Sequence, residues 1–421
     1  MHAPAMFQLS LLMFLAIWCL AIPCPAVIAE DKKPLGYELV AKGIHQELSP
    51  EFCWFHPRVA ALPGYGKEGQ PAVIVTLQKH LAASDHFSGL FVLRTDDLGR
   101  TWTGPTEIPE LGWRQDGDTT VAVIDVTPGW HPQTGTLIAI GAKTLYSKTG
   151  DILRTAIRSY ETSYAVYNPR TNRWTKWREL AVPDTETKFY GSGCGCSQWL
   201  VQPDGKLLLP VQYYSEPGGR WRATMVQCQF DGTDLTYLKH GDELEVEGGY
   251  GYAEPSLIAW HGKYFLTLRH EHRADVTVSD DGLHFQPAKP WTFDDGEDLG
   301  NYNTQTHWLA HQDGLLLIYT RRGANNDHVR WNRAPLFIAE VDPEKLQVLR
   351  RTEKVLFPDR GVMYGNFGAN PITPQESWVT DADLITPLID PDAGKKPHPR
   401  GGDGTVWLGR VKWTQPNQLV K

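Results

Sequence analysis

The chain has 421 residues and a net charge of −8, from 41 Lys and Arg against 49 Asp and Glu. An acidic balance argues against a nucleic-acid partner. The length allows two domains or one large all-β domain. The chain has six cysteines, and the four that follow residue 29 do not form a disulfide scaffold in a domain of this size, so their redox state stays open. These four cysteines are Cys53, Cys194, Cys196 and Cys228.

An apolar segment at residues 7–22 is the first element, and it indicates an export signal. Small residues follow it up to Ala29, where a signal peptidase could cut. The segment is short for a membrane span. We therefore expect residues 1–29 to be a signal peptide and the protein to be secreted or periplasmic, without a membrane anchor.

A turn is predicted at residues 95–102, directly after an apolar run at 90–93. The side chains of Thr95 and Asp97 can accept hydrogen bonds from turn amides, and Gly99 can adopt a positive φ. Trp102 then begins the next strand and packs over the turn. A shorter copy of the pattern stands at residues 279–285, which suggests that one hairpin is built repeatedly.

Two kinds of turn alternate along the chain, and helical periodicity is nearly absent. Each period contains four short apolar strands and spans about fifty to seventy residues, which predicts the four-stranded antiparallel blades of a β-propeller. One kind of turn lies at 131–135, 202–205, 261–263, 312–314 and 373–376; the other lies at 97–102, 168–174, 230–234, 279–285 and 341–345.

The strands predicted to lie nearest the propeller axis give the blade count. Six candidates predict an all-β, six-bladed propeller, with seven blades as the alternative. Residues 35–48 are a candidate strand that closes the ring, and the last strand is predicted at 405–408. We expect residues 30–421 to form a single domain. The six inner strands are centred on Val59, Val121, Trp199, Leu257, Trp308 and Trp378.

The turn at residues 95–102 resembles the Asp-box of the sialidase-like, or BNR-repeat, superfamily, which includes neuraminidase-type propellers. The resemblance implies a six-bladed propeller over nearly the whole chain after the export signal. It places the Asp-boxes on the outer rim and ligands at one end of the axis. Arg, His, Asn and aromatic residues crowd six segments that could reach that end, at 55–58, 252–255, 269–273, 301–308, 321–328 and 364–367.

Arginine suits an acidic sugar because its planar guanidinium binds a carboxylate through two hydrogen bonds. The resemblance implies that Arg58, Arg269 and either Arg321 or Arg322 hold the substrate carboxylate. This family opens with an aromatic-Arg-Ile-Pro motif, whereas this chain has His56 and Pro57 before Arg58. Either Arg58 acts from a shifted position, or His56 replaces the arginine.

The resemblance also implies a catalytic set. Sialidases use a tyrosine nucleophile, because a carboxylate would be repelled by the substrate's own carboxylate. Tyr364 is the corresponding nucleophile here, Glu254 activates it, and Asp85 supplies the proton. Asn303 and His307 are further substrate-binding candidates outside the usual sialidase plan.

The reaction therefore stays open among three alternatives. A sialidase-like exo-glycosidase is our first expectation. A polysaccharide lyase on a uronate-containing glycan, with Tyr364 or a histidine as the base, is the second. A propeller that binds glycan or protein without chemistry is the third.

The remaining expectations concern ligands and assembly. We expect an acidic carbohydrate as substrate, a monomer, and no cofactor. Cys194 and Cys196 lack the second ligand pair of a structural zinc site. The acidic loop at 294–298 lacks the spacing of a calcium motif and is expected to be a solvated turn.

Overall fold

The computed structural model describes residues 1, 34–81, 85–154, 158–386 and 392–420. The chain divides into two units, Met1–Pro34 and Leu35–Lys421. The predicted export signal lies outside the described residues. The described part contains no helix with the length and apolar character that crossing a lipid bilayer requires.

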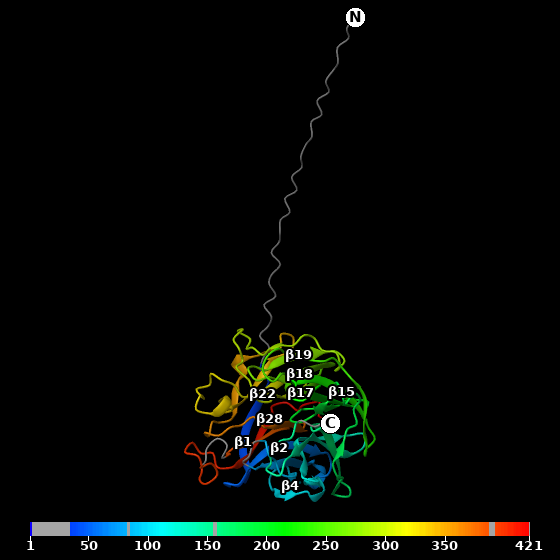
Figure 1. Cartoon of the computed structure of the whole chain (residues 1–421). Helices are drawn as coiled ribbons and strands as arrows, with labels where there is room; N and C mark the ends of the chain where they lie inside the picture. Colours follow the sequence, from blue (N-terminus) through cyan, green and yellow to red (C-terminus); the bar gives the residue numbers. More distant parts are fainter. Residues whose placement is uncertain (2–33, 82–84, 155–157, 387–391, 421) are drawn as a thin grey trace. The chain divides into compact units, whose positions relative to one another are not determined.

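The second unit is built from antiparallel β-sheets, and its described residues contain no α-helix (Figure 1). One four-stranded sheet follows chain order, β2-β3-β4-β5. Its inner strand β3 is buried at nearly every position and on both faces, as expected where sheets pack on each side. The strands are β2 (Cys53–Leu62), β3 (Ala72–His80), β4 (Phe91–Thr95) and β5 (Thr103–Glu107).

The next sheet is the longest, because two antiparallel sets are joined in it by one parallel pair between Ser192 and Glu161. The first set contains β6 (Arg114–Asp116), β7 (Thr119–His131), β8 (Thr136–Tyr146), β9 (Glu161–Asn168), β10 (Arg173–Trp174) and β11 (Arg178–Glu179). The second contains β12 (Gly191–Gly193), β13 (Leu200–Val201), β14 (Leu207–Tyr214), β15 (Arg222–Phe230) and β16 (Leu235–His240).

Two further sheets follow with the same up-and-down order. The first contains β17 (Ala253–Trp260), β18 (Lys263–Arg269), β19 (Asp275–Ser279) and β20 (Lys289–Pro290). The second contains β21 (His307–His311), β22 (Gly314–Tyr319), β23 (Leu336–Asp342), β24 (Gln347–Val348) and β25 (Lys354–Phe357). Short 3-10 turns lie at Lys67–Gly69, Pro109–Leu111, Arg330–Asn332 and Arg350–Thr352.

The last sheet joins the two ends of the unit. Strand β1 (Tyr37–Gln46) pairs antiparallel with β28 (Thr405–Trp413), and β28 pairs with β27 (Glu376–Ala382) beside β26 (Gly368–Thr373). Figure 1 shows β1 and β28 side by side. The predicted closing strand at 35–48 is therefore confirmed, and the final strand is longer than predicted.

The innermost segments contact one another in a closed cycle around one axis. Strand β2 contacts both β7 and β26, and β17 contacts both β14 and β21. Hydrogen bonds link the remaining neighbours: Trp199 Nε1 donates to the Thr127 carbonyl at 3.1 Å, and Gln305 Nε2 donates to the Phe367 carbonyl at 3.3 Å. The predicted inner-strand centre Trp378 is wrong, because Trp378 lies in β27 and the adjacent strand β26 faces the axis.

The predicted turn at residues 95–102, here called the Thr95 turn, is confirmed. Gly99 N donates to Thr95 Oγ1 at 2.8 Å and Thr101 N donates to Asp97 Oδ1 at 2.8 Å, while Gly99 has φ +74°. The turn at 279–285, here called the Ser279 turn, repeats this pattern, with Gly282 N donating to Ser279 Oγ at 2.9 Å. Both connect strands of their sheets away from the inner cycle.

Candidate active site

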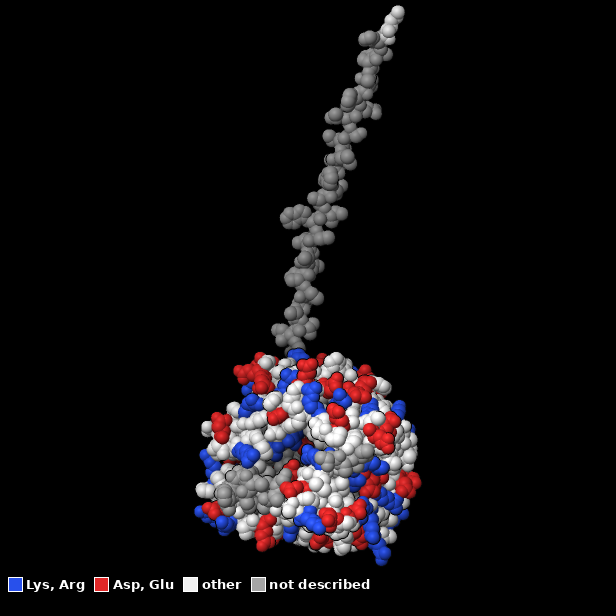
Figure 2. Space-filling view, viewed as in Figure 1, with Lys and Arg blue, Asp and Glu red and all other residues white. Residues whose placement is uncertain are grey.

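Ionisable side chains converge on one cavity of about 340 Å³, here called the axial cavity. It is lined from innermost segments of several sheets, and Figure 2 shows the second unit hollowed near the centre of one face. Its ionisable and polar lining comprises His56, Asp85, Asp125, Arg154, Tyr160, Gln212, Tyr250, Glu254, Arg269, Arg333 and Asn366.

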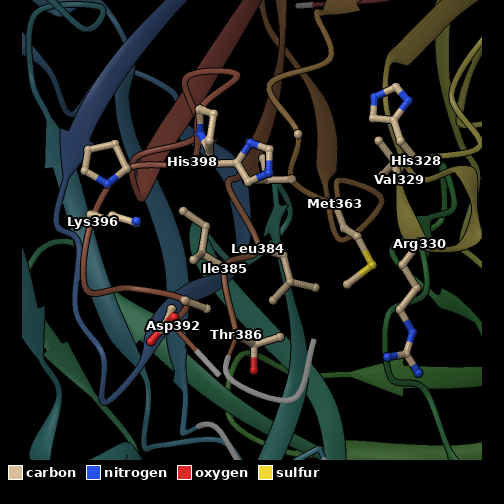
Figure 3. Close-up of a pocket in the computed structure, with 15 residues that line it drawn as sticks. His328, Val329, Arg330, Met363, Leu384, Ile385, Thr386, Asp392, Lys396 and His398 are labelled. Atoms are coloured by element: carbon tan, nitrogen blue, oxygen red, sulfur yellow. The ribbon is translucent and has the colours of Figure 1, made fainter. Parts of the chain in front are cut away.

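Two other cavities lack this convergence. One of about 760 Å³ is lined mostly by Pro, Gly and apolar residues such as Trp130 and Trp199, and none of its lining residues is ionisable. Another of about 200 Å³ has Met363 and Leu384 in its wall beside His328 and His398 (Figure 3). None of the sequence-predicted site residues lines either cavity. The axial cavity is therefore the candidate active site.

Glu254 and Arg269 form a salt bridge in the wall of the axial cavity. The pairing of β17 with β18 slips between Ala253 and Ser256, and Glu254 adopts φ +43° at this bulge. Bulges commonly re-aim a side chain in this way. Arg269 also donates from Nε to the Tyr250 hydroxyl at 3.0 Å and from Nη2 to Asn303 Oδ1 at 3.1 Å.

Arg333 is a second arginine of this wall and is buried, and the sequence did not single it out. Its guanidinium donates to the Asn303 carbonyl and lies over the Trp331 ring, 4.8 Å from the ring centroid. No carboxylate forms a salt bridge with it among the described residues. Burial and the nearby Arg269 lower the pKa of Arg333 to about 10. One positive charge in the wall is therefore left without a direct counter-ion.

His56 lines the axial cavity and Arg58 does not. Arg58 is only 1% exposed and directs its two Nη atoms to neutral partners, Thr127 Oγ1 at 2.6 Å and Gln305 Oε1 at 2.7 Å. Arg58 therefore ties three innermost segments together behind the wall. His56, at a bulge with φ +49°, occupies the wall itself.

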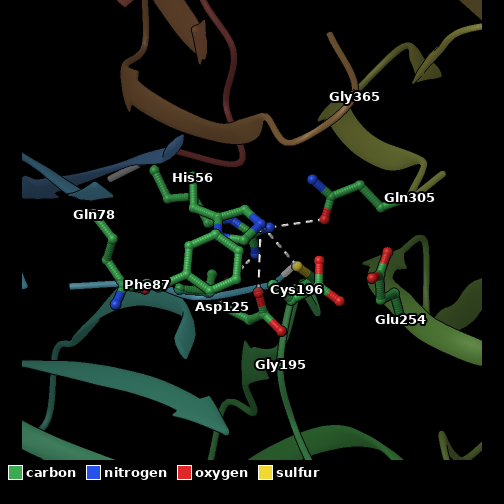
Figure 4. Close-up of polar contacts among 12 residues, drawn as sticks. His56, Gln78, Phe87, Asp125, Gly195, Cys196, Glu254, Gln305 and Gly365 are labelled. Atoms are coloured by element: carbon green, nitrogen blue, oxygen red, sulfur yellow. Dashed lines mark hydrogen bonds and ion pairs between the residues drawn. The ribbon is translucent and has the colours of Figure 1, made fainter. Parts of the chain in front are cut away.

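Asp125 and Cys196 meet His56, as Figure 4 shows. His56 Nε2 lies 3.4 Å from Asp125 Oδ1 and 3.4 Å from Cys196 Sγ. Burial, with Glu254 nearby, raises the pKa of Asp125 to about 7, and burial lowers the pKa of His56. The Asp125 backbone has φ +61° at a bulge of β7, which turns the carboxylate into the cavity.

Two other predicted residues lie in or next to the axial cavity. Asp85 lines it, and its carbonyl accepts a hydrogen bond from the Tyr146 hydroxyl at 2.8 Å. Asn303 lies behind Arg269 and Arg333 and accepts hydrogen bonds from both. His307 is buried deeper, where its Nδ1 lies 2.7 Å from Ser256 Oγ, and it does not line the cavity.

Besides Arg58 and His307, three further predicted residues lie away from the axial cavity. Arg321 pairs with Glu353 at 2.7 Å, and Arg322 stacks on the Tyr302 ring at 4.1 Å. Tyr364 is fully buried in an apolar cluster, 5.9 Å from the Phe357 ring, and its hydroxyl has no hydrogen-bond partner among the described residues. Asn366, two residues further on, does line the cavity.

The tyrosine hydroxyls at the axial cavity belong to Tyr250 and Tyr160. Tyr250 accepts from Arg269, and Tyr160 accepts from Gln212 Nε2 at 2.8 Å. Burial raises the pKa of Tyr250, while Arg269 acts in the opposite direction. A hydrogen bond and a positive charge both stabilise a phenolate, so Tyr250 is the better placed of the two to lose its proton.

The sequence held a signal for one of the missed residues. Asp125 interrupts an otherwise apolar run at 121–126, and a lone acid inside a buried strand needs a specific partner. Cys196 and Arg333 carry no comparable local signal, because their partners come from distant sheets. The predicted acidic turn at 294–298 binds Arg350 through Asp295 and Glu297.

Comparison with solved structures identifies the fold of the chain. No protein-family model and no curated protein sequence matches the chain. Trypanosoma rangeli sialidase with the inhibitor DANA superposes with a TM-score of 0.58 at 15% identity, over 87% of this chain and 56% of that one. The Hadza microbial sialidase gives 0.59 at 12% identity, over 89% and 68%.

NanB sialidase from Streptococcus pneumoniae, as a single-residue mutant, superposes with a TM-score of 0.58 at 11% identity, over 88% of this chain and 70% of that one. The present chain thus spans little more than half the length of the trypanosomal enzyme. Three sialidases from different sources share one arrangement of sheets with it. The chain therefore has the β-propeller fold of sialidases.

Proposed function

We propose that this protein is a carbohydrate-active enzyme that acts on an acidic glycan as a sialidase-like exo-glycosidase. The observation that carries the proposal is the pair Arg269 and Arg333 in one wall of the axial cavity, with Glu254 as the sole carboxylate that forms a salt bridge with either of them among the described residues. Two guanidinium groups, one buried and one partly buried, with a single counter-ion favour the binding of an anion. A sugar carboxylate has the charge and the planar shape that two arginines bind well.

The cavity also offers surfaces for a sugar ring. Trp331 lies at the cavity with 38% of its area exposed, and Trp221 lines the cavity as well. Tryptophan rings present a large apolar face against which the C–H groups of a sugar can pack. A ring held against Trp331 would place its carboxylate near Arg333, because the Arg333 guanidinium stacks on the same indole.

In the proposed reaction, Tyr250 attacks the anomeric carbon, Glu254 accepts the phenolic proton, and Asp85 protonates the leaving oxygen. Water then attacks the anomeric carbon and displaces Tyr250, with Asp85 accepting the water proton and Glu254 returning its proton to the Tyr250 oxygen. Tyr250 is supported by its place in the cavity wall and its hydrogen bond from Arg269. Tyr364, the nucleophile expected from the resemblance, would have to leave the apolar core to attack.

The test is a substrate screen with a matched pair of arginine variants. We expect release of a sugar from sialosides or from uronate-containing glycans. Arg333→Gln should lower kcat/KM on the acidic substrate by about 10²-fold or more, as loss of one charge-binding donor does. Arg321→Gln is the control, since Arg321 is a partly buried arginine outside the cavity. Equal losses in the two variants would contradict the assignment.

A lyase acting on a uronate-containing glycan is the second candidate. It is favoured by His56, which lies in the cavity wall where the resemblance expects an arginine. A lyase creates an unsaturated sugar with ultraviolet absorbance, whereas a hydrolase does not. The same screen, read for absorbance, separates them, and a glycan-binding propeller would give neither product.

The proposal extends to the number of blades and to location. Six blades are supported by the recurrence of left-handed backbone at the axis, at His56, Asp125, Cys196, Glu254 and Asn303, with Gly365 shortly before β26 of the last sheet. Export is supported by the apolar segment 7–22. We further propose a monomer that binds no nucleic acid, in keeping with the net charge of −8.

A further inference from the structure

We propose that His56, Asp125 and Cys196 bind a divalent transition-metal ion of the zinc class in the wall of the axial cavity. The three residues come from three different innermost segments, so the fold itself brings them together. Their ligand atoms, His56 Nε2, Asp125 Oδ1 and Cys196 Sγ, all lie within 4.8 Å of one another. Figure 4 shows the three side chains directed to one point.

The separations match the edges of a coordination tetrahedron. Bond lengths of about 2.0–2.1 Å for Zn–N and Zn–O and about 2.3 Å for Zn–S place tetrahedral ligand atoms about 3.3–3.6 Å apart. The separations from His56 Nε2 to Asp125 Oδ1 and to Cys196 Sγ are both 3.4 Å. An ordinary N–H···O hydrogen bond is shorter, about 2.7–3.2 Å. The separation from His56 Nε2 to Asp125 Oδ1 exceeds that range, as an ion between the two side chains would require, whereas the separation to the larger Cys196 sulfur fits both an N–H···S hydrogen bond and shared coordination.

A nucleophilic cysteine is the competing explanation, and the geometry opposes it. In a Cys-His-acid arrangement the thiol and the acid bind opposite nitrogens of the imidazole ring. Here both Cys196 and Asp125 approach the same nitrogen, Nε2. One nitrogen cannot relay a proton between two partners, whereas convergence on one nitrogen lone pair is the geometry of shared coordination.

The charges of the three ligand groups and the contacts that hold them in place also suit a bound cation. Among the described residues, the only basic side chain within ion-pair distance of Asp125 is His56. The carboxylate and the thiolate formed on binding would balance a divalent ion. The imidazole is held by Phe87, with 5.3 Å between ring centroids, and Cys196 N donates to the Asp125 carbonyl at 2.9 Å.

The ligand set points to zinc and to an open site. Imidazole, thiolate and carboxylate together suit Zn²⁺ better than Ca²⁺ or Mg²⁺, which prefer oxygen ligands. Three protein ligands leave a fourth position, as in catalytic zinc sites. His56 and Asp125 line the axial cavity, so this position faces it and can take water or a sugar oxygen.

The decisive experiment is a cobalt titration of the untagged, full-length protein after treatment with a chelator. We expect one equivalent of Co²⁺ to bind and to produce a thiolate-to-cobalt charge-transfer band, which one equivalent of Zn²⁺ then removes. Elemental analysis should find about one zinc per chain after reloading. Absence of the charge-transfer band, or of stoichiometric zinc, would overturn the proposal whatever the protein's activity.

Two variants and one control locate the ligands. Cys196→Ser should abolish the band, and Asp125→Asn, which keeps the side-chain shape, should weaken binding by about 100-fold or more, since even outer partners of a metal change affinity 10–100-fold. Cys194→Ser is the matched control, because Cys194 is an equally buried thiol two residues away. Loss of the band in Cys194→Ser with retention in Cys196→Ser would refute the assignment.

The test of metal binding can fail or succeed independently of the test of the proposed function. Metal content and the cobalt spectrum are read without any substrate. A protein that binds zinc and cleaves no acidic glycan would leave the metal site standing and reject the glycosidase. A protein that cleaves acidic glycan without stoichiometric zinc would do the reverse.

Discussion

The Thr95 turn and the axial cavity are both polar, hydrogen-bonded regions, yet they are built over different spans of sequence. In the turn, Thr101 N donates to Asp97 Oδ1 four residues away. At the cavity, Arg58 reaches Gln305 across 247 positions. A turn of eight residues carries its own partners, whereas the cavity exists only after the sheets have closed around the axis. The first region should therefore govern stability and the second should govern chemistry.

Replacement of the cavity tyrosine should give the largest effect on activity. Tyr250→Phe removes the proposed nucleophile, so kcat should fall by about 10³-fold or more, as loss of a nucleophile does in other enzymes. Tyr364→Phe is its control. Because the Tyr364 hydroxyl is buried without a partner, its removal should leave kcat unchanged and should not lower the free energy of unfolding. Steady-state kinetics and urea unfolding of both variants decide between the two tyrosines.

A change in the Thr95 turn should have the opposite signature. Asp97 accepts hydrogen bonds from Thr101 N, from Thr101 Oγ1 at 2.6 Å and from Lys67 Nζ at 3.1 Å. Asp97→Ala should lower the free energy of unfolding, since the Thr101 amide and the side chains of Thr101 and Lys67 lose their acceptor. Activity per folded molecule should persist. Asp96→Ala, beside it but half-exposed, should change stability by less than about 1 kcal/mol. A large loss of kcat in Asp97→Ala would show that the rim and the cavity are coupled.

Glycine substitutions sharpen the stability side of the comparison. Gly99 has φ +74°, and a Cβ there would lie 2.7 Å from Arg410 Nη2. Gly262 has φ +78°, with no atom within 4 Å of the same position. Both alanine variants place a Cβ on left-handed backbone, which lowers the free energy of unfolding by about 1–2 kcal/mol. Gly99→Ala should also displace Arg410 from the Leu98 carbonyl, and should therefore be the less stable variant in urea unfolding. Equal losses would mean that the Arg410 contact contributes nothing.

The smallest effect should come from pH at the Ser279 turn. His284 bonds Asp281 at 2.6 Å, which raises the pKa of His284 above 6.5. Because the pKa of His284 is higher in the folded protein than in the unfolded chain, the ion pair stabilises the fold. This stabilisation is fully present below about pH 6.5 and is lost as the pH rises through the pKa of the folded protein. The Thr95 turn has Thr101 in place of a histidine and should show no such dependence. An NMR titration of His284 checks the direction, with Asp281→Asn as the variant that should return the pKa toward 6.5.

The fold could be predicted from the sequence because it depends on local patterns that repeat along the chain. Thr95, Asp97 and Gly99 bond within one turn, and a turn one residue shorter repeats these bonds at Ser279. These turns fixed the strand boundaries, and the pairing of β1 with the last sheet followed from the apolar run near residue 40. None of these inferences required knowledge of which sheets become neighbours.

The cavity was harder to predict, because which side chains line it depends on how the sheets close into a ring around the axis. Arg321 and Arg333 both follow strand β22 and are alike in sequence character, but Arg321 turns to Glu353 and only Arg333 turns to the axis. A functional role for Asp125 and Cys196 can be inferred only when His56 is known to lie beside them, and His56 is 69 positions before Asp125 in the chain. Tyr364 was expected at the cavity from resemblance alone, whereas Asn366 reaches it.

The sheet that joins β1 to β28 has a consequence for the order of folding. Tyr37 pairs with Trp413, so the strand made early in synthesis waits for one made near the end. Until β28 is available, β1 has no antiparallel partner, and the ring around the axis stays open. Contacts this distant in sequence are slow to form, because the entropy of closing a long loop must be overcome first. The three residues of the proposed metal site lie on three of the innermost segments of that ring. The site should therefore assemble late, when the ring closes.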